Sequence, residues 1–257
     1  MKTKSVLDYY WFGLCSRYIQ DAKEGIFIHG DGYILKNIDS FLDRLKELGL
    51  IVTSRAAKDL MKFRDSISKL PESTILDKQQ ADNLKKIMIN LRSTLDAEIA
   101  GFEIYTVTPK ILDVNKLLND VGSLFAPEIF GRLPDIAQYD FIEAGKCIAF
   151  ERPTAAAFHI LRGTEAVLRE FYCYHIRHNR VKDLMWGVIV TDMRTKARTK
   201  KNETLHSNLD NIRKSFRNPT QHPEKIYDIS EVQDLWSICV EVINRMGKTL
   251  PEQEMPF

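Results

Sequence analysis

The stretch that decides the fold is DIAQYDFIEAGKCIAFERPTAAAFHILRGTEAVLREFYCYHIRH, residues 135–178. Its apolar residues recur at three- and four-residue steps, which is the periodicity of amphipathic helices. Pro153 interrupts this pattern, but the first turn of a helix tolerates a proline. The stretch therefore predicts two consecutive helices, at residues 135–151 and 154–178.

Two further helices are predicted downstream. SNLDNIRKSFRN, residues 207–218, reads as a third helix that Pro219 stops. The fourth is expected to begin at Ser230, because SEVQ places this serine three residues before Gln233, as in a capping box. Its expected buried stripe is Val232, Leu235, Trp236, Cys239, Val240, Ile243 and Met246. The second half of the chain thus predicts a helical bundle.

The first half also shows mainly helical periodicity. Apolar residues at three- and four-residue steps between Ile38 and Leu48 are followed by Gly49, a typical stop, and residues 54–70 and 78–100 repeat the pattern. FEIYTV, residues 102–107, alternates aromatic and β-branched residues and predicts a short strand. Prolines at 109, 127 and 134 then mark a connecting region. We expect a mainly α fold with an N-terminal domain at 1–108, a connecting region at 109–134 and a C-terminal domain at 135–257.

Composition limits the functional classes. The 257 residues are 44% hydrophobic and 28% charged, which is typical of an ordered globular protein of one or two domains. A net charge of +2 provides no overall polybasic attraction to nucleic acid or lipid. The N-terminal segment lacks the uninterrupted apolar run of a secretory signal, and no run approaches the ~20 residues of a membrane span. We expect a cytoplasmic protein with no membrane partner.

Cysteine and histidine spacing does not indicate a metal site. The four cysteines show no C-x-x-C spacing and lie in apolar helical patterns, which favours buried thiols in a reducing compartment. The nearest approach to a ligand cluster is Cys173, His175 and His178 in CYHIRH, without a further ligand set. We expect neither a metal nor another cofactor.

Glu165 is a carboxylate on the inner face of the predicted helix 154–178. At about 100° per residue, it falls within about 80° of Phe158, Leu161, Leu168 and Tyr172. A buried carboxylate needs a partner, most simply an arginine. Arg162 and Arg169 can pair with Glu165 at the surface edge, or Glu165 can orient an arginine from another helix.

Arg217 is the candidate for such an arginine, and it lies five residues before His222 in RNPTQH. The residue before a proline is disfavoured in helical conformation, so we expect the chain to turn at Asn218-Pro219 and both side chains to face one pocket. Histidine can take a proton from a ribose 2′-hydroxyl near neutral pH, and arginine can stabilise charge on the phosphate. The spacing by itself is equally typical of a polar turn.

The second half of the chain resembles the HEPN superfamily, helical domains of bacterial toxins, defence proteins and RNA-processing enzymes. The resemblance rests on RNPTQHP between two helices, on EVQDLWSICVEVINRM after it and on EAGKCIAFERPTAAAFHILRGTEAVLRE before it. Many HEPN members have an arginine, a polar residue directly after it and a histidine four to six residues further on. Arg217, Asn218 and His222 occupy these places.

This resemblance implies an antiparallel four-helix bundle and a metal-independent endoribonuclease that leaves a 2′,3′-cyclic phosphate. The implied site forms where two subunits meet: Arg217 stabilises the phosphate, His222 acts as base or acid, Asn218 positions the RNA, and His159, Arg162 and Glu165 support them. A toxin or phage-defence effector is the expected role, with an antitoxin or regulatory protein as a further partner. The alternative is a catalytically inactive HEPN-like module for dimerisation or nucleotide binding.

A basic segment separates the second and third predicted helices of the C-terminal half. It has no apolar periodicity, which is typical of a solvated surface segment. On the RNA-cleaving hypothesis it guides RNA to the site. Its cations are Arg194, Lys196, Arg198, Lys200 and Lys201.

Overall fold

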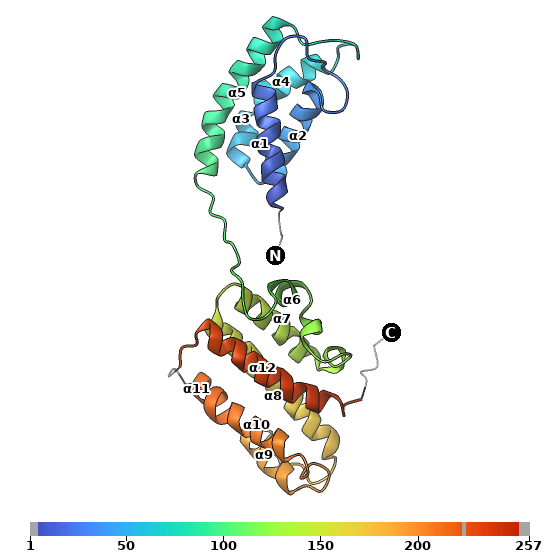
Figure 1. Cartoon of the computed structure of the whole chain (residues 1–257), viewed down its shortest axis with the longest axis vertical. Coiled ribbons are helices and arrows are strands. Elements are labelled where there is room, and N and C mark those ends of the chain that lie inside the picture. The colour runs from blue at the N-terminus through green and yellow to red at the C-terminus, as the bar shows by residue number, and fades with distance from the viewer. Residues whose placement is uncertain (1–4, 223–224, 252–257) are drawn as a thin grey trace. The chain divides into compact units, whose positions relative to one another are not determined.

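The computed structural model describes residues 5–222 and 225–251 and is mainly α-helical, as the sequence predicts. The chain divides into two compact units, Met1–Tyr105 and Thr106–Phe257 (Figure 1). Each unit has its own hydrophobic core.

The first unit contains five helices in its described part: α1 (Val6–Gln20), α2 (Ile34–Glu47), α3 (Ile51–Ala56), α4 (Lys58–Ile67) and α5 (Lys78–Ile99). Helix α5 packs against α1, α3 and α4. Its Glu98 carboxylate accepts hydrogen bonds from the backbone N–H groups of Val52 and Thr53, at 2.9 and 2.7 Å. These bonds satisfy free amides at the start of α3 and fix it against α5.

The strand predicted at residues 102–107 is absent. Residues 102–110 have no regular secondary structure, and the isolated antiparallel bridge between Phe27 and Ile75 is the one β pairing in the described part of the chain. The alternating pattern favours an extended backbone, but a strand also needs a neighbour for its hydrogen bonds. Ile104 and Tyr105 are 72% and 80% exposed, so no described residue pairs with this segment as a strand.

The second unit consists of α6 (Val114–Asn119), two short 3₁₀ turns (Val121–Leu124 and Phe130–Arg132), α7 (Asp135–Ala149), α8 (Pro153–His175), α9 (Trp186–Thr195), α10 (Glu203–Ile212), a π-helical turn (Arg213–Arg217), α11 (Asn218–Gln221) and α12 (Ile229–Gly247). Helix α8 packs against α7, α9 and α12, while α10 packs against α9 and α12 (Figure 1). This arrangement makes α8 the central helix of the unit.

The predicted connecting region belongs largely to this second core. Five of its apolar residues are buried there: Leu117, Val121, Phe125, Ile129 and Leu133. A Cβ added to Gly145 of α7 would lie 2.5 Å from the carbonyl oxygen of Leu117, so a residue without a side chain lets α6 approach α7 closely. The prolines therefore do not separate this segment from the core.

Helix α12 carries the predicted buried stripe, from Val232 to Met246, but its N-cap is not Ser230. Asp228 is the cap: its side chain accepts a hydrogen bond from the N–H of Glu231 at 2.8 Å, and its own N–H donates to the Glu231 carboxylate at 3.3 Å. The prediction was wrong because Asp-x-x-Glu satisfies the same capping rule two residues earlier. Among the described residues, no helix has the length and apolar character that a membrane span requires.

Candidate functional site

The third predicted helix does not stop at Pro219, and the chain does not turn there. Asn218 has φ −64° and ψ −49°, which is helical, and the helix continues through a π-helical turn into α11 as far as Gln221. The N–H of Asn218 bonds to the carbonyl of Arg213, five residues back. The expected turn at Asn218-Pro219 is therefore wrong.

The π-helical turn explains how the helix accommodates this proline. In a regular α-helix the ring of Pro219 would clash with the carbonyl of residue 215, and residue 219 would lack a donor. A wider turn just before the proline relieves this conflict. The carbonyl oxygen of Phe216 accepts hydrogen bonds from two hydroxyls, those of Thr220 at 2.6 Å and Tyr227 at 3.3 Å. These side-chain hydrogen bonds help to hold the helix beside Arg217.

A pocket of about 220 Å³ lies where α8 faces this turn. Four of the six residues expected to form the site line it together with three further residues: Phe158, His159, Leu161, Arg162 and Glu165 of α8, Arg217 of the π-helical turn and Gln221 of α11. Phe158 is 48% exposed, whereas its place on the predicted inner face implied burial.

Glu165 has partners from two helical segments. One carboxylate oxygen accepts a hydrogen bond from Arg169 at 2.6 Å, and the other lies 3.5 Å from Nη2 of Arg217. The glutamate side chain is 16% exposed and that of Arg217 is 28% exposed. Glu165 therefore meets an arginine of its own helix and one from the π-helical turn, which combines the two predicted arrangements. The Nε of Arg217 is buried without a hydrogen-bond partner in the described part of the chain.

Arg162 does not pair with Glu165. It donates two hydrogen bonds to Asp140 of α7, from Nε at 2.7 Å and from Nη2 at 2.5 Å. Asp140 is fully buried, and its Oδ1 also lies 2.8 Å from Nδ1 of His159. Gly163 permits this arrangement, because a Cβ there would lie 3.2 Å from the Cβ of Asp140. The hydrogen bond to Asp140 raises the pKa of Arg162.

Asp140 is the site residue that sequence reasoning missed. The sequence pattern could have indicated its burial, because Asp140 lies on the same helical face as the buried α7 residues Ala137, Phe141, Ala144 and Ile148. A carboxylate on such a face must find partners, and the next helix supplies both of them.

His222 is not brought into the pocket. It directly follows α11 with an extended backbone and is exposed, whereas Gln221, four residues after Arg217, shares its face of the helix and lines the pocket. Asn218 faces a different pocket. Within one copy of the chain, Arg217 and Asn218 of the predicted trio therefore share this second pocket, and His222 lines neither pocket.

This second pocket has a volume of about 610 Å³ and lies between α9 and the π-helical turn. Arg217 lines both pockets, and Trp186, Asp192 and Arg213 also line the larger one. Asp192 accepts a hydrogen bond from the hydroxyl of Tyr172 at 2.6 Å. Burial, and then this bond, raises the pKa of Tyr172.

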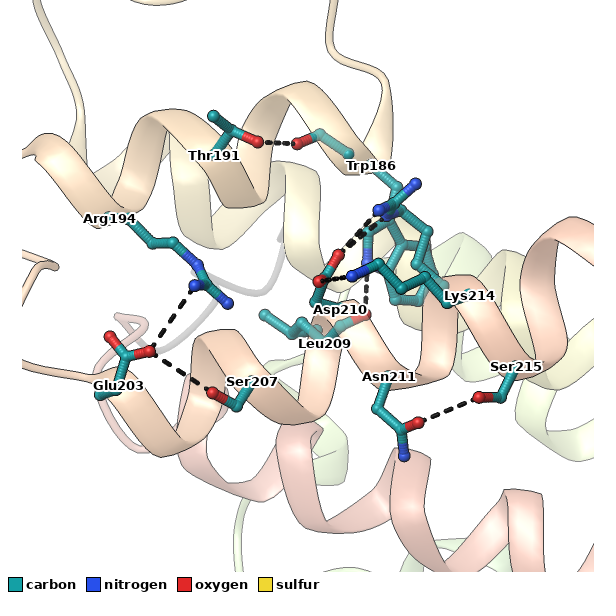
Figure 2. A network of polar contacts seen from close by, with 12 residues as sticks. Trp186, Thr191, Arg194, Glu203, Ser207, Leu209, Asp210, Asn211, Lys214 and Ser215 are labelled. Atoms are coloured by element: carbon teal, nitrogen blue, oxygen red, sulfur yellow. Dashed lines mark hydrogen bonds and ion pairs between the residues drawn. The ribbon is translucent and has the colours of Figure 1, made fainter.

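The turn itself is fixed by an ion-pair cluster. Asp210 pairs with Lys214 at 2.7 Å (Figure 2) and with Arg213 at 2.8 Å. These two cations hold the pKa of Asp210 below its usual value. The indole N–H of Trp186 donates to the carbonyl of Leu209 at 3.0 Å, which ties α9 to α10 (Figure 2).

The basic segment is only partly free for a ligand. Arg194 lies 3.6 Å from Glu203, and Lys196 lies 3.4 Å from Asp192 (Figure 2 shows the first pair). The remaining three, Arg198, Lys200 and Lys201, are exposed and have no ion pair within the described ranges. The segment is a short turn between α9 and α10, closed by a hydrogen bond from the buried Thr199 hydroxyl to the carbonyl of Met193 at 2.6 Å.

The histidines and cysteines form no visible ligand set. No group of three His, Cys, Asp or Glu suited to a metal ion occurs in residues 5–222 and 225–251. His175 instead contacts the hydroxyl of Thr249 at 3.0 Å. Burial raises the pKa of Cys239 to about 12, so this thiol is inert.

Comparisons of this chain with protein-family models, with curated proteins and with solved structures found no match.

Proposed function

We propose that the chain is a metal-independent endoribonuclease of HEPN type, acting as a toxin or phage-defence effector. The observation that carries this proposal is the pocket in which Arg217 meets His159, Arg162 and Glu165. Cations held by carboxylates around an opening of this kind suit a phosphodiester, whose charge rises during cleavage.

The charges around the pocket leave donors for a phosphate. Arg162, Arg169 and Arg217 face the two carboxylates Asp140 and Glu165, so the balance is positive. The contact of Arg217 with Glu165 is long, at 3.5 Å, and its Nε lacks a partner among the described residues. Nε is buried, so the proposed phosphate contact is made by the exposed edge of the guanidinium, whose side chain is 28% exposed and is oriented by Glu165.

His222 reaches the scissile bond by way of a second copy of the chain. Its exposed position just outside the pocket suits a side chain that completes a partner's site. Helix α7 carries exposed apolar residues at three-residue steps, Ile136, Tyr139 and Ile142, and Phe158 is exposed at the pocket. Apolar surface next to a polar site is typical of an interface, and we assign it to a homodimer.

The direct test is incubation of the purified protein with total RNA in the presence of a chelator. We expect cleavage by the wild type and a loss of at least about 100-fold in Arg217→Ala and His222→Ala. Lys214→Ala is the matched control, because Lys214 lies in the same π-helical turn but pairs with Asp210. Cleavage that persists in both site variants, or growth inhibition that persists in His222→Ala, contradicts the proposal.

The exposed cations Arg198, Lys200 and Lys201 are proposed to guide RNA to this site. Charge reversal at these residues should weaken RNA binding strongly at low salt and little at high salt, since their contribution is counterion release. A loss of affinity that does not depend on salt contradicts an electrostatic role. An antitoxin or regulatory partner and a cytoplasmic location remain part of the proposal.

The larger pocket favours a second candidate function, a nucleotide-binding and dimerising module that does not cleave RNA. Its volume of about 610 Å³ lies within the range of small-ligand sites, and it is bounded by Arg213, Arg217 and Asp192. This candidate predicts a folded homodimer that binds a mononucleotide and leaves RNA intact.

A further inference from the structure

We infer that His159 is the general base of the site, taking the proton from the ribose 2′-hydroxyl. The inference rests on the proposed function and deepens it, because the sequence assigned His159 only a supporting role. Cleavage by 2′-hydroxyl attack needs one group that accepts a proton and one that donates a proton. His222 supplies the second of these.

The hydrogen bond to Asp140 fixes which nitrogen of His159 can react. Nδ1 lies 2.8 Å from Oδ1 of Asp140, and this carboxylate has no exposed surface. A carboxylate only accepts, so Nδ1 carries the proton and Nε2 carries the lone pair. The imidazole is 27% exposed and lines the pocket, which leaves Nε2 as the ring nitrogen available to a substrate.

Arg162 shares Asp140 with this histidine. Its guanidinium forks onto both oxygens of Asp140 and balances the charge of that carboxylate. The other charged or titratable groups nearby are Arg217 and Glu165 at the pocket and Tyr139, which interacts with Arg162. An imidazole oriented by a buried carboxylate is the arrangement of a general base.

The proposed step balances without any further reactant. Nε2 of His159 takes the 2′-hydroxyl proton as the 2′-oxygen bonds to phosphorus. The bond from phosphorus to the 5′-oxygen then breaks, and protonated His222 gives its proton to that oxygen. The products are a 2′,3′-cyclic phosphate and a 5′-hydroxyl, and both histidines regain their starting state by exchange with solvent.

Two substitutions separate proton transfer from structural support. In His159→Asn the amide can still donate a hydrogen bond to Asp140, so the fold is kept while the base is lost. We expect cleavage in chelator to fall about 10² to 10⁴-fold with an unchanged melting temperature. In His159→Ala we expect added imidazole to restore part of the activity. His175→Ala is the control, since His175 ends the same helix outside the pocket.

The outcomes distinguish this inference from the function on which it rests. Wild-type cleavage with an inactive His159→Asn and imidazole rescue of His159→Ala supports both. Wild-type cleavage that His159→Asn retains within about threefold, or a His159→Ala variant that imidazole does not rescue, overturns the inference and leaves the endoribonuclease in place. Absence of wild-type cleavage overturns both.

Discussion

Asp140 is the residue on which the charges of the pocket depend, because it is fully buried and holds both Arg162 and His159. Arg162→Ala would leave this carboxylate with the histidine alone. We therefore expect the free energy of unfolding to fall by about 1–3 kcal/mol, measured in urea. Arg169→Ala is the matched control: its partner Glu165 keeps Arg217 and the arginine is half exposed, so the loss should stay below about 1 kcal/mol. Equal losses in the two variants contradict the assigned pairings.

His206 predicts how stability depends on pH. It is fully buried, neither ring nitrogen has a hydrogen-bond partner in the described part of the chain, and burial lowers its pKa. The unfolded chain takes up a proton at this residue below a pH of about 6.5, and the folded chain does so only at lower pH. Stability therefore falls as the pH drops below that value.

His206→Met should remove this contribution. We expect its unfolding free energy to decline less between pH 7 and pH 5 than that of the wild type, by up to about 1.4 kcal/mol per pH unit. His175 is partly buried, and its pKa is also lowered, by burial and then by Arg198; it contributes equally to both proteins. Parallel stability curves for wild type and variant would show that His206 does not titrate in this way.

Only some of the ion pairs at this site could be predicted from the sequence. The helical face of Glu165 and its approach to Arg217 could be predicted, because both follow from periodicity and from the need of a carboxylate for a partner. The preference of Arg162 for Asp140 could not, because it depends on the close crossing of α7 and α8 at Gly163.

Among the helices, α12 gives a direct test of which residue caps its N-terminus. Asp228 caps this helix, whereas Ser230, the cap predicted from sequence, lies inside it. We expect Asp228→Ala to lower the free energy of unfolding by about 0.5–2 kcal/mol and Ser230→Ala to change it by less than about 0.5 kcal/mol. The denaturant midpoints of the two variants measure the difference. A larger loss of stability in Ser230→Ala than in Asp228→Ala would show that Ser230 is the cap.

The π-helical turn at Arg213–Arg217 is the element that the sequence could not reveal. Proline preferences favour a break at residue 219, yet hydrogen bonds from Thr220 and Tyr227 to Phe216 stabilise a continuous helix. These hydrogen bonds join residues up to eleven positions apart, so a local sequence pattern cannot predict them. The strand expected at residues 102–107 failed for a related reason, because its alternation could not show whether a partner strand exists.

For the whole molecule, the division into Met1–Tyr105 and Thr106–Phe257 predicts which fragments fold. A fragment of residues 106–257 keeps the complete second core and should unfold cooperatively by calorimetry. A fragment of residues 135–257 loses Leu117, Val121, Phe125, Ile129 and Leu133 from that core. Each large apolar side chain removed costs about 2–5 kcal/mol, so this shorter fragment should not form a stable fold. Equal melting temperatures for the two fragments contradict the assignment of residues 114–134 to the core.

Metal-independent cleavage by 2′-hydroxyl attack is tested most directly by the chemistry of the RNA ends after digestion in chelator, determined by mass spectrometry. We expect 2′,3′-cyclic phosphate and 5′-hydroxyl ends from the wild type and their disappearance in Arg217→Ala. Ends with a 3′-hydroxyl and a 5′-phosphate, or the same products from the variant, would contradict it.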